Sequence, residues 1–249
     1  MSTFVHQLRS EQLVFWRSRE AAVFIFIFPI MLFVLLASVF GDGDYEGRPV
    51  TDYLLTGLLG YGAANTAFAG LAITLVIRRE YGILKRLRST PLTPAVYLAG
   101  VLASSLVVFA LQAVVLIALG RLVFDAELPA HPVGVALTLV FGAAAMAALG
   151  VGVAGLIRSE EGASAVVNVI VLPMTFLSGG FGPTRNLPRF LEAVADALPL
   201  RHFLDAVQGV YLDGDQPWDH AASLAVVAAW GVVGLLLAIR YFSWQPRGR

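Results

Sequence analysis

The chain has 249 residues, of which 58% are hydrophobic and only 14% are charged, and its mean hydropathy is +0.78. A soluble globular domain carries about 25% charged residues, so most of this apolar surface must face a lipid bilayer. The formal net charge of zero argues against a nucleic-acid partner, and the absence of cysteine excludes disulfides, thiolate metal sites and cysteine nucleophiles.

The N-terminal segment, residues 1–20, is predicted to be an interfacial amphipathic helix that lies on the membrane surface. Large apolar residues fall roughly on one face of a helix over 2–18, and Arg9 and Arg17 lie away from that face, which is the pattern of a surface helix. Gln12 interrupts the apolar face. The apolar residues are Phe4, Val5, Leu8, Phe15 and Trp16.

The fold class is predicted to be an all-α membrane protein with six transmembrane helices in a single domain over 1–249. A hydrocarbon core about 30 Å thick needs about 20 apolar residues in a helix. The fifth segment is short and carries Pro173 near its end, which predicts a kink or a re-entrant continuation. The six segments are about 21–40, 53–77, 95–120, 133–157, 162–178 and 221–242.

Basic residues are distributed unequally between the two sides that six spans create. The side with both termini and the 78–94 and 158–161 connections holds 12 of the 17 basic residues and five of the 17 acidic ones, which gives the two sides net charges of +7 and −7. Because loops rich in arginine and lysine stay in the cytoplasm, we expect both termini to be cytoplasmic.

Two connections are long enough to hold further structure. In 78–94, the stretch from Glu80 to Thr90 is predicted to form about three helical turns. Its Ile83, Leu84 and Leu87 would face the membrane or the spans, and Lys85, Arg86 and Arg88 would face the cytosol. The external connection, 179–219, begins with a glycine-rich turn and continues with two short amphipathic stretches.

The spans lack the groups that proton-coupled transport requires. No Asp, Glu, Lys, Arg or His lies in the middle of any predicted span, whereas proton relays place ionisable groups at that depth. Sodium can be held by carbonyls and hydroxyls alone, so this argument is weaker for sodium. Any uphill transport should therefore draw its energy from outside the bilayer. The 78–94 connection could be the lever for that energy, or its five basic residues could simply retain the loop inside.

The remaining polar candidates in the spans are uncharged. A set of five residues could line a translocation path, but hydrogen bonding between helices explains its polar members equally well. The five are Asn65, Gln112, Asn168, Thr175 and Phe176.

Two stretches resemble a known family. The run from Arg79 to Leu92, REYGILKRLRSTPL, resembles the cytoplasmic loop of bacterial ABC type-2 permeases, including the daunorubicin-resistance exporter group, which reads roughly R-E-x-G-T-L-E-R-L-R-x-T-P-L. The chain departs from that pattern at Ile83 and Lys85. The stretch LPMTFLSGGF, from Leu172 to Phe181, is similar to the end of the family's fifth span, where external re-entrant helices follow.

This resemblance implies a permease of the bacterial cytoplasmic membrane that binds no cofactor itself. ATP and Mg would be bound by two copies of a separate ATP-binding subunit, and a second permease chain, identical or homologous, would complete the pathway. The chain has no G-x-x-x-x-G-K-[ST] phosphate loop. The implied ATPase-coupling residues are Glu80, Tyr81, Gly82, Leu84, Lys85, Arg86, Leu87 and Arg88, and those of the external gate loop are Gly179, Gly180, Phe181, Pro183 and Pro188.

The uncharged pathway residues, together with aromatic Phe176, suit an amphiphilic, drug-like or lipid-like solute, and the resemblance implies that this solute leaves the cytoplasm. A polysaccharide or lipid-linked glycan exporter of the same class is one alternative, and a channel that needs no ATP is another. An intramembrane protease would need a serine turn and a histidine within the membrane; Ser178 precedes Gly179, but His202 and His220 fall outside the spans or at their rim.

Overall fold

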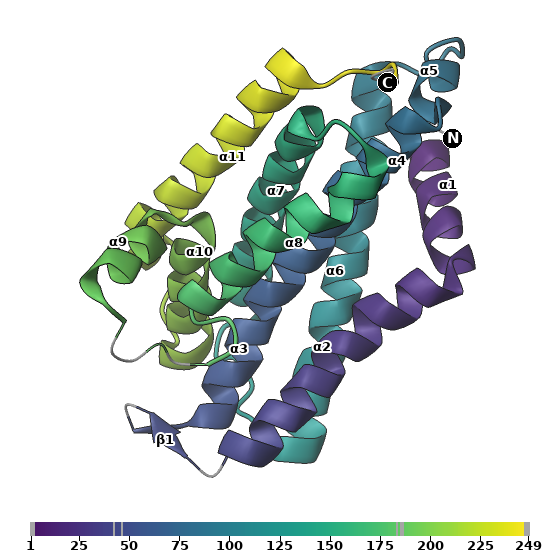
Figure 1. The fold of residues 1–249 in the computed structure, drawn as a ribbon. Helices are drawn as coiled ribbons and strands as arrows, with labels where there is room; N and C mark the ends of the chain where they lie inside the picture. Colours follow the sequence, from purple (N-terminus) through teal and green to yellow (C-terminus); the bar gives the residue numbers. More distant parts are fainter. Residues whose placement is uncertain (1–2, 42, 46, 183, 185–186, 247–249) are drawn as a thin grey trace.

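The computed structural model describes residues 3–41, 43–45, 47–182, 184 and 187–246, which form a helical bundle with one short antiparallel hairpin (Figure 1). The elements in chain order are α1 (Thr3–Arg17), α2 (Arg19–Phe40), β1 (Asp44–Tyr45), β2 (Arg48–Pro49), α3 (Val50–Gly62), the π-helix η1 (Ala63–Gly70), α4 (Leu71–Glu80), α5 (Ile83–Leu87), α6 (Pro94–Phe124), α7 (Pro132–Leu156), α8 (Glu160–Leu177), α9 (Arg189–Ala197), α10 (Pro199–Gln208), the π-helix η2 (Gly209–Asp213), the 3₁₀-helix η3 (Pro217–His220) and α11 (Ala221–Tyr241).

Six helical stretches in the described part of the chain are long and apolar enough to cross a membrane, and each coincides with a predicted span. The prediction of an all-α membrane protein is therefore confirmed. The second stretch, Val50–Glu80, is longer than the predicted 53–77 because it includes charged residues at both ends. Those charges have partners: Asp52 accepts a hydrogen bond from the Glu127 N–H, and Arg78 pairs with Glu11.

The two ends of the bundle differ in what they carry. The start of α1, the helix α5 and the end of α11 lie at one end, which we call the α5 end, and β1 lies at the other, the hairpin end (Figure 1). Near the hairpin end, α10 packs against α3, and η2 is joined to the hairpin by an Arg48–Asp213 ion pair of 3.2 Å.

The second and fourth membrane-length helices form the interior of the bundle. In each, 72% of the most apolar stretch is buried, against 17% in the helices of α2 and α11. The helix α11 approaches α7 very closely, since a Cβ added to Gly152 would lie 2.5 Å from the Gly234 carbonyl oxygen. Small residues permit such contacts between helices that share no hydrophobic driving force in lipid.

Candidate coupling and transport site

The connection between α4 and α6 has less helix than predicted. The helix α4 continues through Glu80, a turn follows at Tyr81 and Gly82, and α5 covers only Ile83–Leu87. The expectation of three continuous turns from Glu80 to Thr90 is therefore wrong. Gly82 adopts a φ of 69°, a left-handed conformation that ends a helix and that glycine reaches without steric cost.

The faces of α5 largely follow the expectation. Leu84 is fully buried in the hydrophobic core, and the partly buried Leu87 packs against that core. Ile83, which was expected to face the membrane or the spans, is 41% exposed and so does not face the spans. The outward face of the connection carries an aromatic ring and three cations, all of them exposed: Tyr81, Lys85, Arg86 and Arg88.

Arg79, just before the turn, is fully buried, although sequence analysis assigned it to the charged connection. Its Nη1 donates to the Ala154 carbonyl oxygen at 2.9 Å and its Nη2 to that of Ile157 at 2.7 Å. These carbonyls belong to the C-terminal end of α7, where a cation is favoured by the helix dipole. Its Nε also pairs with Glu80 at 2.7 Å. Arg79 thus holds the end of α4 to the end of α7.

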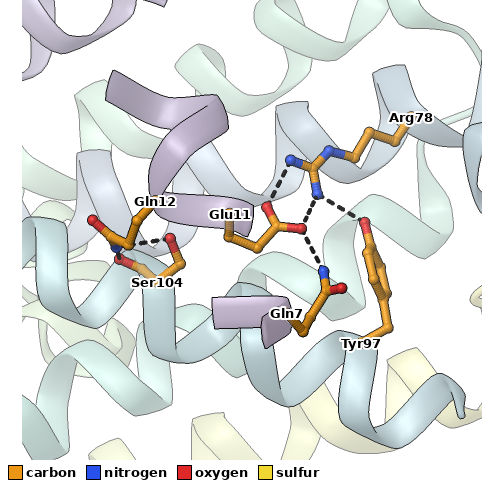
Figure 2. A network of polar contacts seen from close by, with 6 residues as sticks. All are labelled: Gln7, Glu11, Gln12, Arg78, Tyr97 and Ser104. Carbon is orange, nitrogen blue, oxygen red and sulfur yellow. Dashed lines mark hydrogen bonds and ion pairs between the residues drawn. The ribbon is translucent and has the colours of Figure 1, made fainter. Parts of the chain in front are cut away.

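Arg78 faces the opposite way and joins α4 to α1 and α6. Its Nη1 and Nη2 donate to the two Glu11 carboxylate oxygens at 2.9 and 2.7 Å, and Nη1 also donates to the Tyr97 hydroxyl at 2.9 Å (Figure 2). Gln7 donates to the same carboxylate at 2.7 Å. This two-point pairing of guanidinium and carboxylate is the strongest form of charge-assisted hydrogen bond.

The helix α1 packs on the bundle through polar residues. Gln12 donates from Nε2 to the Ser104 carbonyl and hydroxyl oxygens at 3.0 and 2.9 Å (Figure 2). Glu11 is buried, whereas Trp16 and Phe4 are exposed. The interfacial position of α1 stays a prediction, and the contacts of its polar side chains with α4 and α6 were not predicted. Gln12, which interrupts the apolar stripe, was the available signal.

The network of Arg78 and Arg79 fixes the base of the second span to three other helices. In the described part of the chain, no group of three His, Asp or Glu side chains could hold a metal ion.

The predicted pathway residues do not form one cluster of hydrogen bonds. Gln112 is buried, accepts a hydrogen bond from Thr66 at 2.9 Å and donates to the Ile25 carbonyl at 3.1 Å. Thr175 is buried and donates to the Val171 carbonyl within its own helix at 2.8 Å. The remaining three are more accessible: Asn65 is half-buried, and Asn168 and Phe176 are exposed.

The Gln112 contact has a local cause. Pro29 lies inside α2 and has no backbone N–H, so the Ile25 carbonyl four residues earlier loses its helical donor. The Gln112 side chain supplies the missing hydrogen bond from α6. Hydrogen bonding between helices therefore accounts for the burial of Gln112.

The turn after α8 packs tightly against α3. Gly179 adopts a φ of 82°, and a Cβ on Gly57 would lie 2.7 Å from the Gly180 carbonyl oxygen. The ring of Phe181 contacts that of Phe176, with centroids 4.7 Å apart, and both line a cavity of about 470 Å³ at the hairpin end.

Pro188, a further residue of the external gate loop, lies outside that packing. It is exposed just before α9, and Pro183 lies outside the described residues. Ser178 has a buried hydroxyl for which the described residues offer no hydrogen-bond partner. His202 and His220 bond to the Asp196 carbonyl and to Asp215 instead. The described side chains therefore show no serine–histidine pair.

A second polar network closes the hairpin end. Arg48 lies 3.7 Å from Glu127 and 3.2 Å from Asp213, and the Tyr211 hydroxyl donates to the Glu127 carbonyl at 3.0 Å. Burial raises the pKa of Tyr211, and the nearby Asp52 raises it further, so this hydroxyl remains a donor at neutral pH. The network connects the hairpin, η2 and the α6–α7 connection.

The sequence profile of the ABC-2 type transporter family matches residues 4–212. YvfS of Bacillus subtilis, named as a transport permease, is 23% identical over 232 residues, which are 93% of this chain and 90% of that protein. YbhR of Escherichia coli, named as a multidrug ABC transporter permease, is 26% identical over 161 residues, or 64% of this chain and 44% of that protein. YhhJ of Escherichia coli, named as an inner membrane transport permease, is 26% identical over 145 residues, or 56% and 38%.

The chain thus spans less than half the length of YbhR and YhhJ. The family match covers most of the chain, and with the six membrane-length helices it confirms the resemblance seen in the two motifs. The chain belongs to the ABC-2 type transporter family and is a multi-pass membrane permease of an ABC transporter.

Proposed function

We propose that this permease exports an amphiphilic, drug-like or lipid-like solute, driven by ATP that a separate subunit hydrolyses with Mg. The observation that carries the proposal is the outward face of the α5 connection, which presents Tyr81, Lys85, Arg86 and Arg88 on a segment attached to the base of the second span. Two ATP-binding subunits dock on α5 and on α1, one on each of two permease chains.

The path of force follows from the contacts beneath α5. Leu84 is fully buried, and the neighbouring Arg78 and Arg79 connect α4 to α1, α6 and α7. A subunit that pushes α5 therefore tilts several spans at once. With both termini in the cytoplasm of a bacterium, α5 faces the compartment that holds ATP. The positive charge of α5 favours this orientation.

The cargo class rests on the chemistry of the candidate pathway. Asn65 and Asn168 are uncharged and accessible, and Phe176 and Phe181 place aromatic rings at a cavity near the hairpin end. Such a mixture of amide and aromatic surface suits an amphiphile. The name of YbhR as a multidrug permease agrees with this class.

The test is co-purification with the ATP-binding subunit encoded beside this chain, followed by ATPase and transport assays in vesicles. The triple variant Lys85→Ala, Arg86→Ala, Arg88→Ala should weaken subunit binding by about tenfold or more, which corresponds to 1.4 kcal/mol. The control removes two exposed arginines at the same end of the bundle that lie outside α1 and α5, and it should bind normally: Arg158→Ala and Arg240→Ala. Normal binding and ATPase stimulation in the first variant would remove the docking role of α5.

A further inference from the structure

The cavity of about 470 Å³ at the hairpin end lies where α2, α3 and α8 meet the hairpin. Phe40 at the end of α2, Val50 at the start of α3 and Phe176 near the end of α8 all line it. Its volume is in the range of sites for drug-sized molecules, about 300–1,000 Å³. The predicted topology places this end outside the cytoplasm, where an exported solute is released.

Aromatic rings supply much of the lining. Phe40 and Phe176 are 56% and 62% exposed, so their rings are accessible to a ligand. An apolar molecule gains free energy by covering such rings, and a positive charge is attracted to a ring face within about 6 Å of its centroid. The four aromatic lining residues are Phe40, Tyr45, Phe176 and Phe181.

Asp44 in β1 is the only charged residue among the described residues that line the cavity. Its Oδ1 accepts a hydrogen bond from the Gly47 N–H at 2.9 Å, which fixes the carboxylate in the turn without neutralising it. Arg48, in the same hairpin, pairs with Asp213 and Glu127 instead. The cavity therefore combines aromatic rings with a negative charge.

This combination selects the charge and the polarity of a ligand. An anion would be repelled by the Asp44 carboxylate and by the negative faces of the rings. A small hydrated cation would gain little, because Asp44 is exposed to water and an ion pair at such a site contributes at most about 1 kcal/mol. A cation that carries apolar groups can use the rings and the carboxylate together.

We propose that this cavity binds an organic cation with an apolar body, with its positive charge between Asp44 and the aromatic rings. The inference rests on the proposed export function. It narrows the drug-like cargo to a cation, and it makes the cavity the last site that the cargo occupies before release.

The experiment measures equilibrium binding to the purified full chain alone in a non-ionic detergent. The probe is radiolabelled tetraphenylphosphonium. Radiolabelled tetraphenylborate, an anion of similar size and shape, is measured in separate samples. Only the saturable part of the binding is assigned to the protein, because uptake by detergent does not saturate. Tetraphenylphosphonium should bind at least about tenfold more tightly than tetraphenylborate, which corresponds to about 1.4 kcal/mol.

A first variant tests the carboxylate. Asp44→Asn removes the charge and keeps an Oδ1 that can accept the Gly47 hydrogen bond. It should weaken tetraphenylphosphonium binding by about threefold, on the scale of an exposed ion pair. Asp125→Asn is the matched control, because it removes an exposed acidic residue that follows α6 and does not line the cavity. Its binding should equal that of the wild type.

A second variant tests the rings. The pair Phe40→Leu, Phe176→Leu keeps apolar side chains at two exposed positions but removes their ring faces. It should weaken tetraphenylphosphonium binding by about tenfold, since each cation–π contact contributes about 0.5–1 kcal/mol at exposed sites. Phe190→Leu, at an exposed position in α9 that does not line the cavity, should bind normally.

Three outcomes would overturn the proposal: equal affinity for the two ions, no saturable binding of tetraphenylphosphonium, or unchanged binding in both variants. The second outcome is expected if lipid or a second permease chain fills the cavity. ATP-driven export by the complex with its ATP-binding subunit is measured separately. Export of a solute without tetraphenylphosphonium binding would contradict this site alone. Saturable binding without any ATP-driven export would contradict the proposed function and leave the binding site standing.

Discussion

At the scale of single residues, Arg79 shows how this fold accommodates a buried cation. Its guanidinium is removed from water, yet it bonds to two carbonyls at the end of α7 and to the Glu80 carboxylate. Replacement by an apolar residue of similar length would leave those carbonyls without this donor and Glu80 without its partner. Hydrogen bonds to charged groups contribute about 1.5–3 kcal/mol each, and orphaned buried acceptors add to the loss.

We therefore expect Arg79→Met to lower the apparent melting temperature in detergent by about 5–10 °C, since 1 kcal/mol corresponds to about 2–4 °C at this size. Arg79→Lys should be intermediate, because an ammonium group cannot reproduce the planar fork of donors. Arg86→Met removes an exposed arginine from the next helix and should change the melting temperature little. Equal effects of Arg79→Met and Arg86→Met would contradict the clamp between α4 and α7.

Asp205 in α10 predicts a pH dependence at the hairpin end. Burial raises the pKa of its carboxyl above the ordinary value, and the nearby Arg201 and His202 oppose this only in part. The native state therefore holds this proton to higher pH than the unfolded chain does, so stability falls as pH rises from the ordinary carboxyl range through the raised pKa.

Asp205→Asn should accordingly raise the melting temperature at pH 7 and have little effect at pH 3, below both pKa values. Melting curves from pH 3 to 8 test this, with Glu192→Gln, on the exposed surface of α9, as the control. A lower melting temperature for Asp205→Asn at pH 7 would show that its ion pair with Arg201 outweighs burial.

At the scale of helices, α2 and α6 are joined by a hydrogen bond that compensates for the proline inside α2. Gln112 donates to the Ile25 carbonyl that Pro29 leaves without a helical donor. Gln112→Leu should destabilise the protein by about 1 kcal/mol, in the range of hydrogen bonds between membrane helices. Pro29→Ala restores the N–H within α2, so it should reduce the effect of Gln112→Leu.

A double-mutant cycle on melting temperature measures this coupling, because a shared hydrogen bond makes the two changes non-additive. Thr66→Val serves as a second reference, since it removes the donor to Gln112 Oε1 and leaves Ile25 untouched. Strictly additive effects of Pro29→Ala and Gln112→Leu would mean that the Gln112 amide does not compensate for the proline.

The elements that were predictable from sequence are those that depend on local composition. Runs of about 20 apolar residues determine the membrane-length helices, and all six were located. The predicted bounds of the second span, 53–77, were too short because partners far away in the sequence stabilise the charges at its ends. Glu11, for example, lies 67 residues from Arg78. No local pattern reveals such a pair.

The exposed residues of the candidate site were predictable from the sequence, but the contacts that hold its helices in place were not. The exposed cations of α5 and the buried Leu84 follow from amphipathic spacing, whereas the early end of the helix follows from Gly82, whose left-handed backbone overrides the helical pattern around it. The partners of Arg79 are carbonyl oxygens on α7. Backbone acceptors carry no sequence signature, so this clamp required the structure.

At the scale of the whole molecule, each end of the bundle is closed by its own polar network, and apolar helices lie between them. Arg78 and Arg79 organise the α5 end, and Arg48 and Tyr211 organise the hairpin end. Polar contacts at both surfaces and apolar contacts between them are what a bilayer demands, since unpaired polar groups are costly only in its interior. Which end faces the cytoplasm is then decided by the charge bias.

The predicted orientation can be tested because the chain contains no cysteine. Ser89 follows α5 and Ala193 lies in α9, and both are exposed. In intact cells, a membrane-impermeant maleimide should label Ala193→Cys and should reach Ser89→Cys only after permeabilisation, because the arginine-rich side stays in the cytoplasm. The cysteine-free wild type gives the background. Labelling of Ser89→Cys in intact cells would reverse the topology and would place α5 on the side without ATP, which would contradict the proposed docking of the ATP-binding subunit as well.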